Sequence, residues 1–206
     1  DNLFRAGRLL DRETEAVATY CLDYARWDDT YNYIYNRNPD YIQSNFDPQY
    51  IKQQKISTVT ILDLKGRPVY SITCDPLTYE EKIFLDIEDT NSRFRQLIEK
   101  GIKEPDSVIK GIINTTQGLC LVASYPIVDS KSTMPARGRL IAGRFLTWKE
   151  QDVIRNMLKV EVYLHRYDNS RGMKEIARKA AFDDIHRNIE RYAGEIRIYQ
   201  RLKDVL

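Results

Sequence analysis

The stretch Ile56–Cys74, "ISTVTILDLKGRPVYSITC", carries the clearest structural pattern in the sequence. Its first half is rich in β-branched residues and alternates in polarity as far as Leu64. Residues 65–67, "KGR", are typical of a turn, and a second run of strand-forming residues begins at Pro68. We therefore predict a β-hairpin over this stretch.

More strands are predicted further along the chain. Residues 108–130 indicate a second pair of strands that turns near residue 117, and residues 138–146 indicate another strand. Two more are predicted over residues 160–167 and 195–206. Because short turns join neighbouring strands, the sheet should be antiparallel. We therefore predict an α+β fold and not a doubly wound parallel sheet.

A long helix should precede the hairpin. Residues 1 to about 36 contain no proline and predict one continuous helix, which must lie across one face of the sheet to bury its aromatic half. Short helices should follow Asn38 and Asp47, since each can cap a helix whose first turn holds a proline. Three further helices are predicted over residues 91–100, 147–158 (capped by Thr147) and 173–182.

The long helix carries a heptad pattern that is interrupted at Glu13. Its first seam is Leu3, Leu10, Val17, Tyr24 and Tyr31, and its second is Ala6, Tyr20, Trp27 and Ile34. We expect the aromatic C-terminal half to cover the core. We expect the N-terminal half (Leu3, Ala6, Leu10, Val17) to pair with a second copy of the chain in a homodimer. The alternative is that the whole stripe packs on the chain's own sheet.

Composition excludes several classes of protein. The 206 residues suffice for one domain with a hydrophobic core. A net charge of +2 provides no long-range attraction for nucleic acid, so no such partner is expected. The three cysteines and two histidines lack metal-ligand spacing, and neither a metal nor a cofactor is predicted. No stretch is apolar for the roughly 18 residues that a membrane span needs.

Five blocks of sequence form an ordered set. They are "YARWDDTYNYI" (24–34), "SNF" (44–46), "ISTVTILDLKGRPVYS" (56–71), "GLCLVASYPIVDS" (118–130) and "ARGRLIAGRFL" (136–146). In order and spacing they resemble the CHASE-type extracytoplasmic sensor domain of the fourth class, which is Cache-like and related to PAS domains. The resemblance covers about residues 15 to 165 and extends weakly to the C-terminus.

This resemblance implies a periplasmic or extracellular sensor domain between two membrane spans, without catalysis of its own. It would feed a histidine kinase, a diguanylate cyclase or phosphodiesterase, or a chemoreceptor. The whole chain would be one domain with a long helix packed on a PAS/Cache-like antiparallel sheet. Residues 1–36 would form the dimerisation helix, residues 37–167 the core, and residues 168–206 a C-terminal helix and a last strand that leads to a span.

An acidic and aromatic motif in the long helix is a candidate ligand site. Trp27, Asp28 and Tyr31 would form the wall of a small-molecule pocket, in which Asp28 accepts hydrogen bonds from an amine or a hydroxyl. The alternative is structural. Asp28 would then accept hydrogen bonds from main-chain N–H groups of the loop at residues 44–46, because a buried carboxylate needs such partners.

Two further residues belong to the structural alternative. Asp29 and Asn45 would complete a clasp between the helix and the loop at residues 44–46. A catalytic pair made of Asp28 and Asp29 is disfavoured, because adjacent residues of a helix point in different directions. No catalytic residue is therefore predicted.

The predicted sheet adds three candidates for the ligand pocket. Ser124 and Tyr125 point to opposite faces of their strand, and the one that faces inward would contribute a polar group. Arg144 shares a strand face with small and apolar residues. It should pair with an acid such as Asp28, bind a ligand carboxylate in bidentate fashion, or reach solvent at the sheet edge.

Two functions fit these residues. The first is a ligand-sensing extracytoplasmic input domain of a transmembrane signal-transduction receptor. The second is a structural dimerisation or partner-protein-binding module of a membrane receptor, without a small ligand. A closed pocket under residues 24–31 that contains unpaired polar groups would favour the first.

Overall fold

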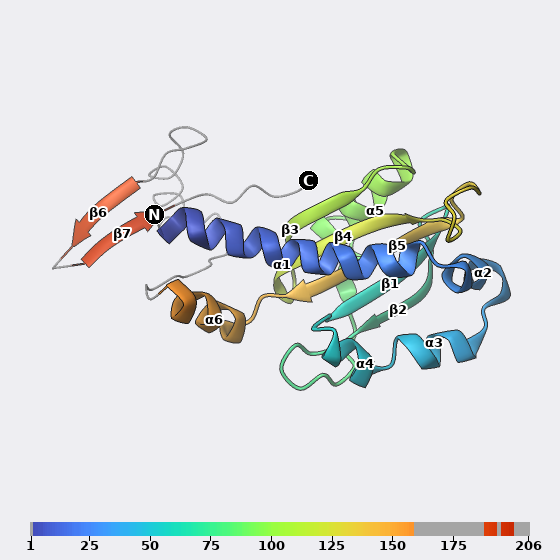
Figure 1. Ribbon diagram of the computed structural model, residues 1–206, viewed down its shortest axis with the longest axis horizontal. Helices are drawn as coiled ribbons and strands as arrows, with labels where there is room; N and C mark the ends of the chain where they lie inside the picture. Colours follow the sequence, from blue (N-terminus) through green and yellow to red (C-terminus); the bar gives the residue numbers. More distant parts are fainter. Residues whose placement is uncertain (1, 159–187, 193–194, 200–206) are drawn as a thin grey trace.

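The structure of the chain, a computed structural model, describes residues 2–158, 188–192 and 195–199 (Figure 1). The helices are α1 (Asn2–Ala25), α2 (Asp28–Asn36), α3 (Pro39–Asn45), α4 (Pro48–Gln53), α5 (Arg93–Lys103) and α6 (Trp148–Leu158), with a short 3₁₀ helix η1 (Leu85–Ile87). The strands are β1 (Thr58–Asp63), β2 (Pro68–Thr73), β3 (Ile109–Thr115), β4 (Gly118–Ile127), β5 (Gly138–Phe145), β6 (Asn188–Tyr192) and β7 (Glu195–Tyr199).

A five-stranded antiparallel sheet in the order β2-β1-β5-β4-β3 forms the centre of the fold. The predicted hairpin is β1 and β2, and its turn contains Gly66 at a positive φ of 71°. The second predicted pair is β3 and β4. α1 runs across one face of the sheet and α5 lies on the other (Figure 1). The predicted α+β fold, a long N-terminal helix on an antiparallel sheet, is confirmed.

Strand β5 is buried along its whole length and separates two apolar clusters. Because side chains alternate along a strand, Leu140 and Ala142 face α1, whereas Ile141 and Phe145 face α5. The alternation of the sequence "GRLIAGRFL" predicts this division. The same alternation sends the two arginines of β5 to opposite faces, Arg139 with the α5 side and Arg144 with the α1 side.

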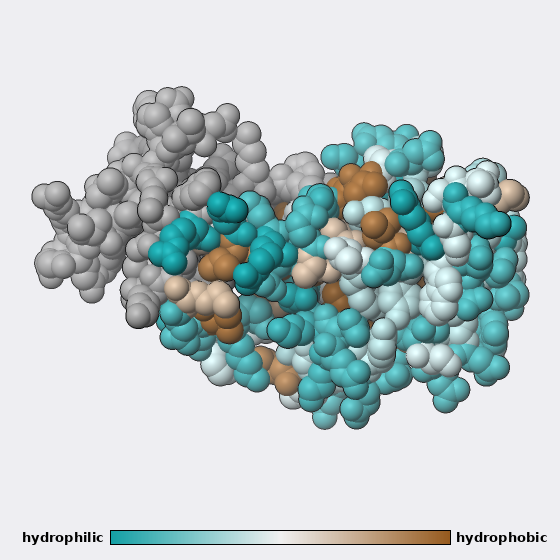
Figure 2. All heavy atoms as spheres, in the orientation of Figure 1, coloured by the Kyte–Doolittle hydropathy of each residue, from teal (hydrophilic) through white to brown (hydrophobic). Residues whose placement is uncertain are grey.

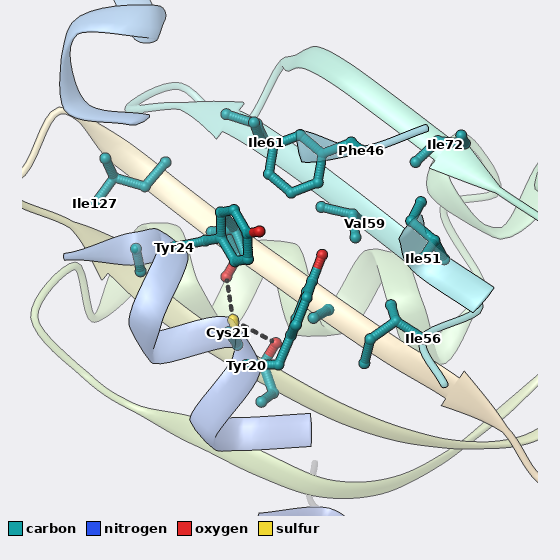
Figure 3. Close-up of a cluster of buried hydrophobic side chains, with 14 of the residues drawn as sticks. Tyr20, Cys21, Tyr24, Phe46, Ile51, Ile56, Val59, Ile61, Ile72 and Ile127 are labelled. Atoms are coloured by element: carbon teal, nitrogen blue, oxygen red, sulfur yellow. Dashed lines mark hydrogen bonds between the residues drawn. The ribbon is translucent and has the colours of Figure 1, made fainter. Parts of the chain in front are cut away.

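Figure 3 shows the cluster beneath α1. Tyr20 and Tyr24 project from the helix toward the apolar side chains of β1 and α4. Between them, the thiol of Cys21 donates to the carbonyls of Ala123 and Leu140 at 3.4 and 3.3 Å. Burial raises the pKa of Cys21 to about 12, so this thiol stays protonated and unreactive at neutral pH.

The prediction of one helix over residues 1–36 is wrong, because the helix breaks at Trp27. The backbone of Trp27 is extended, with φ −128° and ψ 134°. The Ala25 carbonyl, which would bond to residue 29 in a continuous helix, accepts the main-chain N–H of Val128 at 3.0 Å. Asp28 and Asp29 occupy the first turn of α2, where carboxylates interact favourably with the helix dipole. The two adjacent carboxylates therefore begin a second helix.

The apolar stripe of α1 is buried within the chain itself. Ala6, Leu10 and Val17 are 7%, 4% and 0% exposed, and Ile112 packs against the first two. The predicted pairing of this stripe with a second copy is wrong for these three residues, and the side chain of Leu3 lies outside the described part. The outward face of α1 is mostly hydrophilic (Figure 2). Its exposed residues include Arg5, Arg8, Asp11, Arg12, Glu15, Ala16, Thr19 and Asp23.

The three predicted helix caps are confirmed. The side chains of Asn38, Asp47 and Thr147 accept main-chain N–H groups of Asp40, of Gln49 and Tyr50, and of Lys149, respectively. Strand β7 covers the beginning of the predicted last strand. The strand predicted over residues 160–167, the helix predicted over 173–182 and the end of the last strand at 200–206 lie outside the described residues.

A buried arginine joins α5 to the sheet. Arg139 is 5% exposed, and no carboxylate of the described residues forms a salt bridge with it. Its guanidinium donates instead to Ser124 Oγ and to the carbonyls of Gly101, Glu104, Pro105, Ser107 and Ser124, over distances of 2.6 to 3.3 Å. Burial lowers the pKa of Arg139, and these acceptors compensate its buried charge. The guanidinium thus holds the carbonyls at the end of α5.

Replacing Arg139 should therefore cost much more stability than replacing Arg144. Arg139→Met leaves buried carbonyls without donors, and we expect urea unfolding to show a loss of roughly 3–5 kcal/mol. Gly101→Ala should also destabilise, because a Cβ there would lie 2.5 Å from Arg139 Nε. The matched control is Arg144→Met, with an expected loss of about 1–2 kcal/mol, since its partner Glu13 can turn to solvent. Equal losses for both arginines would contradict this role of Arg139.

Candidate functional site

The break between α1 and α2 is fastened by the loop that joins β4 to β5. Asp28 Oδ1 accepts the main-chain N–H of Ser130 at 2.9 Å, and Ser130 Oγ accepts the main-chain N–H of Asp28 at 3.1 Å. The predicted clasp at Asp28 therefore exists, but its partner is wrong: the loop at residues 44–46 does not bind this carboxylate. Asp28 is exposed, so the contact is a surface clasp and not a buried one.

The same loop holds Tyr31. The Tyr31 hydroxyl donates to the Pro135 carbonyl at 3.2 Å. Arg137 lies over the Tyr31 ring at 3.7 Å and over the Tyr35 ring at 4.6 Å, and it donates to the Tyr31 carbonyl at 3.2 Å. A cation over an aromatic face stabilises such a contact by about 0.5–1 kcal/mol at exposed sites. Asp28 and Tyr31 are thus both engaged with residues of the chain itself.

An aromatic cluster lies under the break. The Trp27 ring makes edge contacts with Tyr24 and with Tyr41, each with ring centroids 5.8 Å apart. The Tyr41 hydroxyl shares a short hydrogen bond with the buried hydroxyl of Thr30. Burial raises the pKa of Tyr41, and the nearby charge of Asp29 raises it further, so the phenol is neutral. Trp27 is 36% exposed and joins the end of α1 to α3 through these rings.

Next to this cluster, α2 and α3 border a surface hollow of about 330 Å³, most of whose lining residues are exposed, so it is not the closed pocket under residues 24–31 that would favour a ligand site. Its lining is polar and amide-rich, and consists of Asp29, Asn32, Asn36, Asn38, Asp40, Tyr41, Ser44 and Asn45. A hollow of this size can hold a small molecule. Small-molecule pockets are usually lined by apolar side chains, so this one suits a polar ligand. In the view of Figure 2, the end of the molecule formed by α2 and α3 is hydrophilic.

Several lining groups already have partners within the chain. The Asn32, Asn36 and Asn38 side-chain oxygens accept hydrogen bonds from the Arg137 guanidinium and from the main-chain N–H groups of Asn38 and Asp40, respectively. Asn45 Nδ2 donates to the Tyr41 carbonyl at 2.8 Å. The carboxylates of Asp29 and Asp40, in contrast, form no hydrogen bond or salt bridge with any described residue.

The six predicted ligand residues do not meet in one place. Ser124 is buried on the α5 side, where it bonds with Arg139. Tyr125 packs against the cluster beneath α1 and is only half-buried. Trp27, Asp28 and Tyr31 lie at the break, as described above. Their proposed ligand contacts stay a prediction.

Arg144 pairs with an acid, as one interpretation of the sequence proposed, but the acid is not Asp28. Its Nη1 donates to Glu13 Oε2 at 2.7 Å and its Nε donates to the Lys55 carbonyl at 2.6 Å. This contact explains why Glu13 interrupts the apolar stripe of α1, since an apolar residue there would leave a guanidinium that is 8% exposed without its acid.

The two residues predicted as a structural clasp, Asp29 and Asn45, both line the hollow. Sequence reasoning missed Asn32, Asn36, Asn38, Asp40 and Ser44. A signal was present, because four asparagines occur between residues 32 and 45. Asparagine is also typical of turns and helix caps, and this segment contains both, so its composition alone does not indicate a site.

Among the described residues, no group of three or more His, Cys, Asp or Glu side chains could hold a metal ion. None of the helices in the described ranges has both the length and the apolar character needed to cross a membrane.

A family model defines the class of protein, and two solved structures share its fold. Each of those structures resembles this chain, in which a long helix lies on a five-stranded antiparallel sheet. The family model of the CHASE4 domain matches residues 9–165. The chain therefore belongs to the CHASE4 family, whose members are extracellular sensor domains of receptors, as the sequence resemblance predicted.

Three known signalling proteins contain segments that are similar to this chain in sequence or in structure. The methanogenesis regulatory histidine kinase FilI of Methanothrix harundinacea (strain 6Ac) is 28% identical over 137 residues, which are 66% of this chain and 15% of that protein. The extracellular domain of the histidine kinase vpHK1S-Z8 superposes with a TM-score of 0.54 at 14% identity, over 75% of this chain and 58% of that chain.

A second solved structure covers more of the chain. A domain of a sensory box/GGDEF family protein from Vibrio parahaemolyticus superposes with a TM-score of 0.63 at 14% identity, over 99% of this chain and 89% of that chain. At such identities the likeness concerns the fold alone. The chain spans about a seventh of the length of this curated relative.

The clasp at the break can be tested by two neighbouring alanine variants. Asp28→Ala removes the acceptor of the Ser130 N–H, and we expect it to lower the free energy of unfolding by about 1–2 kcal/mol. Asp29→Ala removes a carboxylate of the same helix turn that has no such bond, so its cost should be about 0.5 kcal/mol. Urea unfolding measures both. Equal costs would mean that only the helix dipole matters at Asp28.

Proposed function

We propose that this domain is the ligand-sensing, extracytoplasmic input domain of a transmembrane signal-transduction receptor. The observation that carries the proposal is the polar hollow between α2 and α3, which lies near the end of α1 and is lined by two carboxylates that bond to no other described residue. Membership of a sensor family supports a signalling role. Two similar proteins, a histidine kinase and a GGDEF family protein, support a kinase, cyclase or phosphodiesterase as the output. A chemoreceptor output is equally compatible with the fold.

The position of the hollow gives it access to α1. Asp29 and Asn32 belong to α2, which begins at the break, and Tyr41 contacts Trp27 at that break. A ligand that binds one arrangement of α2 and α3 more tightly than another would shift the population of that arrangement. The change would reach α1 through Trp27 and through the loop between β4 and β5. The hollow and α1 would then be coupled. The coupling free energy equals the difference in the free energy of ligand binding between the two arrangements of α2 and α3.

In this role the domain performs no catalysis. It lies outside the cytoplasm, with membrane spans before α1 and after the last strand of the full-length receptor. Its partner is a small molecule, and no nucleic acid takes part. If the domain instead bound a partner protein or served only for dimerisation, the hollow would be a surface feature without a ligand.

The first experiment is thermal unfolding of the domain with a panel of amino acids, carboxylates, amines and sugars. A compound at one hundred times its dissociation constant should add roughly 2.7 kcal/mol of stability, or about 5 to 10 °C in the midpoint for a domain of this size. Ser44→Tyr places a ring in the hollow and should abolish the shift. Gln43→Tyr, on the exposed surface of the same helix, should retain it. A panel without any shift would contradict ligand sensing and favour the partner-binding alternative.

We also propose a homodimer through α1, in which the outward face of the helix replaces the buried stripe. Ala16 is an exposed small residue on that face. Ala16→Arg should therefore separate the dimer without loss of stability, as measured by sedimentation equilibrium and urea unfolding. Gln53→Arg, exposed on α4, is the control and should leave the mass unchanged. A wild-type chain that is monomeric at high micromolar concentration would refute the dimer.

A further inference from the structure

We propose that α6 and the N-terminal end of α1 form a surface that docks on an anionic lipid bilayer. Three large apolar side chains of α6 lie in solvent: Trp148, Val153 and Met157 are 58%, 52% and 52% exposed. Burying such side chains is favourable, and tryptophan is enriched where lipid meets water. The proposal goes beyond ligand sensing and takes from the proposed function only a membrane span before α1.

These apolar side chains lie beside a basic end of α1. Helix α6 contacts α1, and Leu146, which precedes α6, packs against Ala6 and Leu10. Figure 2 shows apolar atoms of α6 and strongly hydrophilic atoms of the N-terminal end of α1 on the same face of the molecule. The exposed charged residues of segments 5–12 and 148–157 are four cations and one acid: Arg5, Arg8, Arg12, Lys149 and Asp11.

The half-buried acids of these segments and of Glu13 do not cancel this charge, because each has a partner within the chain. The partners are Arg12 and Arg144 for Glu13, Arg155 for Asp152, and the Thr147 N–H and hydroxyl for Glu150. With these partners counted, the region holds six cations and four acids, and it stays basic.

Another set of exposed apolar side chains has the opposite surroundings. Ile83 and Leu85 are 81% and 63% exposed. The exposed charged residues of segment 80–89 are four acids and one lysine: Glu80, Glu81, Glu88, Asp89 and Lys82. An anionic surface would repel this second set. Exposed apolar and cationic side chains thus occur together at α6 and the start of α1, and not at Ile83 and Leu85.

That combination fits a lipid surface better than a second copy of the chain. Basic side chains around an aromatic and aliphatic face are typical of elements that lie on anionic membranes. A second copy aligned in parallel would instead place Arg5 and Arg12 opposite equal charges. Arg12 lies only about 15 Å along the helix from Asn2, so a membrane span before α1 would bring this end to the bilayer.

Vesicles of two compositions test the docking. In a flotation assay, the 206-residue chain should bind vesicles of phosphatidylglycerol, with roughly tenfold weaker binding to vesicles of neutral phosphatidylcholine. Raising the salt concentration from about 50 to about 500 mM should weaken binding to phosphatidylglycerol severalfold, because salt screens the attraction.

The two tryptophans of the chain report which end touches the lipid. Phosphatidylglycerol with brominated acyl chains quenches the fluorescence of an indole that reaches the bilayer. Trp27→Phe leaves Trp148 as the reporter, and we expect it to be quenched. Trp148→Phe leaves Trp27, at the opposite end of α1, and we expect no quenching.

Matched pairs of substitutions test the charges. Arg5→Gln with Lys149→Gln should weaken binding to phosphatidylglycerol vesicles roughly tenfold, because two cations are lost. The control is Lys65→Gln with Lys131→Gln, which removes the same charge from exposed positions in the β1–β2 turn and the β4–β5 loop. It should change binding less than about twofold, because charges far from the bilayer are screened.

A second matched pair tests the apolar side chains. Val153→Gln with Met157→Gln should weaken binding and should leave the unfolding midpoint nearly unchanged, because both side chains are exposed. Ile83→Gln with Leu85→Gln is the control, and it should retain binding.

Four results would overturn the proposal. They are no binding to phosphatidylglycerol vesicles, equal binding to both lipids, quenching of Trp27 but not Trp148, and equal effects of the test and control pairs. Loss of self-association in the Val153→Gln, Met157→Gln variant without lipid, measured by sedimentation equilibrium, would also overturn it, since a second copy would then cover α6. The metabolite panel tests ligand sensing separately, so either proposal can fail while the other stands.

Discussion

Two arginines in the central strand determine how the layers of this domain fit together. β5 is buried from end to end, and a guanidinium in such a strand requires hydrogen-bond acceptors from whatever packs on it. Arg139 finds them in the carbonyls at the end of α5, and Arg144 finds Glu13 of α1 and the Lys55 carbonyl. Each face of the sheet is thus joined to its helix by one buried charge. The apolar clusters supply most of the stability, and the arginines set the position of the helices over the strands.

The fold was predictable where the pattern is local. Alternation in residues 56–74 and 138–146 defines strands, their faces and the hairpin, because a strand has a period of two wherever it lies in a sheet. The break at Trp27 is different, since the heptad pattern continues through it without proline. It depends on Val128, which supplies an N–H to the Ala25 carbonyl from more than one hundred residues away. No local pattern contains that donor.

At the candidate site too, the sequence indicates local chemistry but not the distant residues that the fold brings near. A clasp at Asp28 and an acid partner for Arg144 were each one of several interpretations of the sequence, and the structure contains both contacts. Their partners, Ser130 and Glu13, depend on which loop and which helix turn the fold brings near, and the sequence predicted other ones. The hollow was missed because its asparagines also serve as caps and turn residues. The polar surface that these asparagines share forms only when α2 and α3 lie side by side.

The contacts along α1 suggest where the domain can transmit a change. Its middle is fixed to the sheet by the buried apolar stripe and by Arg144 with Glu13, and the ion pair of Lys110 with Glu15 at the surface adds little. Its end is fixed differently, by the exposed clasp of Asp28 with Ser130 and by ring contacts of Trp27. Exposed clasps cost less free energy to rearrange than buried ones. Under the proposed function, a ligand between α2 and α3 therefore acts first on the exposed clasp at the break, whereas the buried α1 responds as one rigid body.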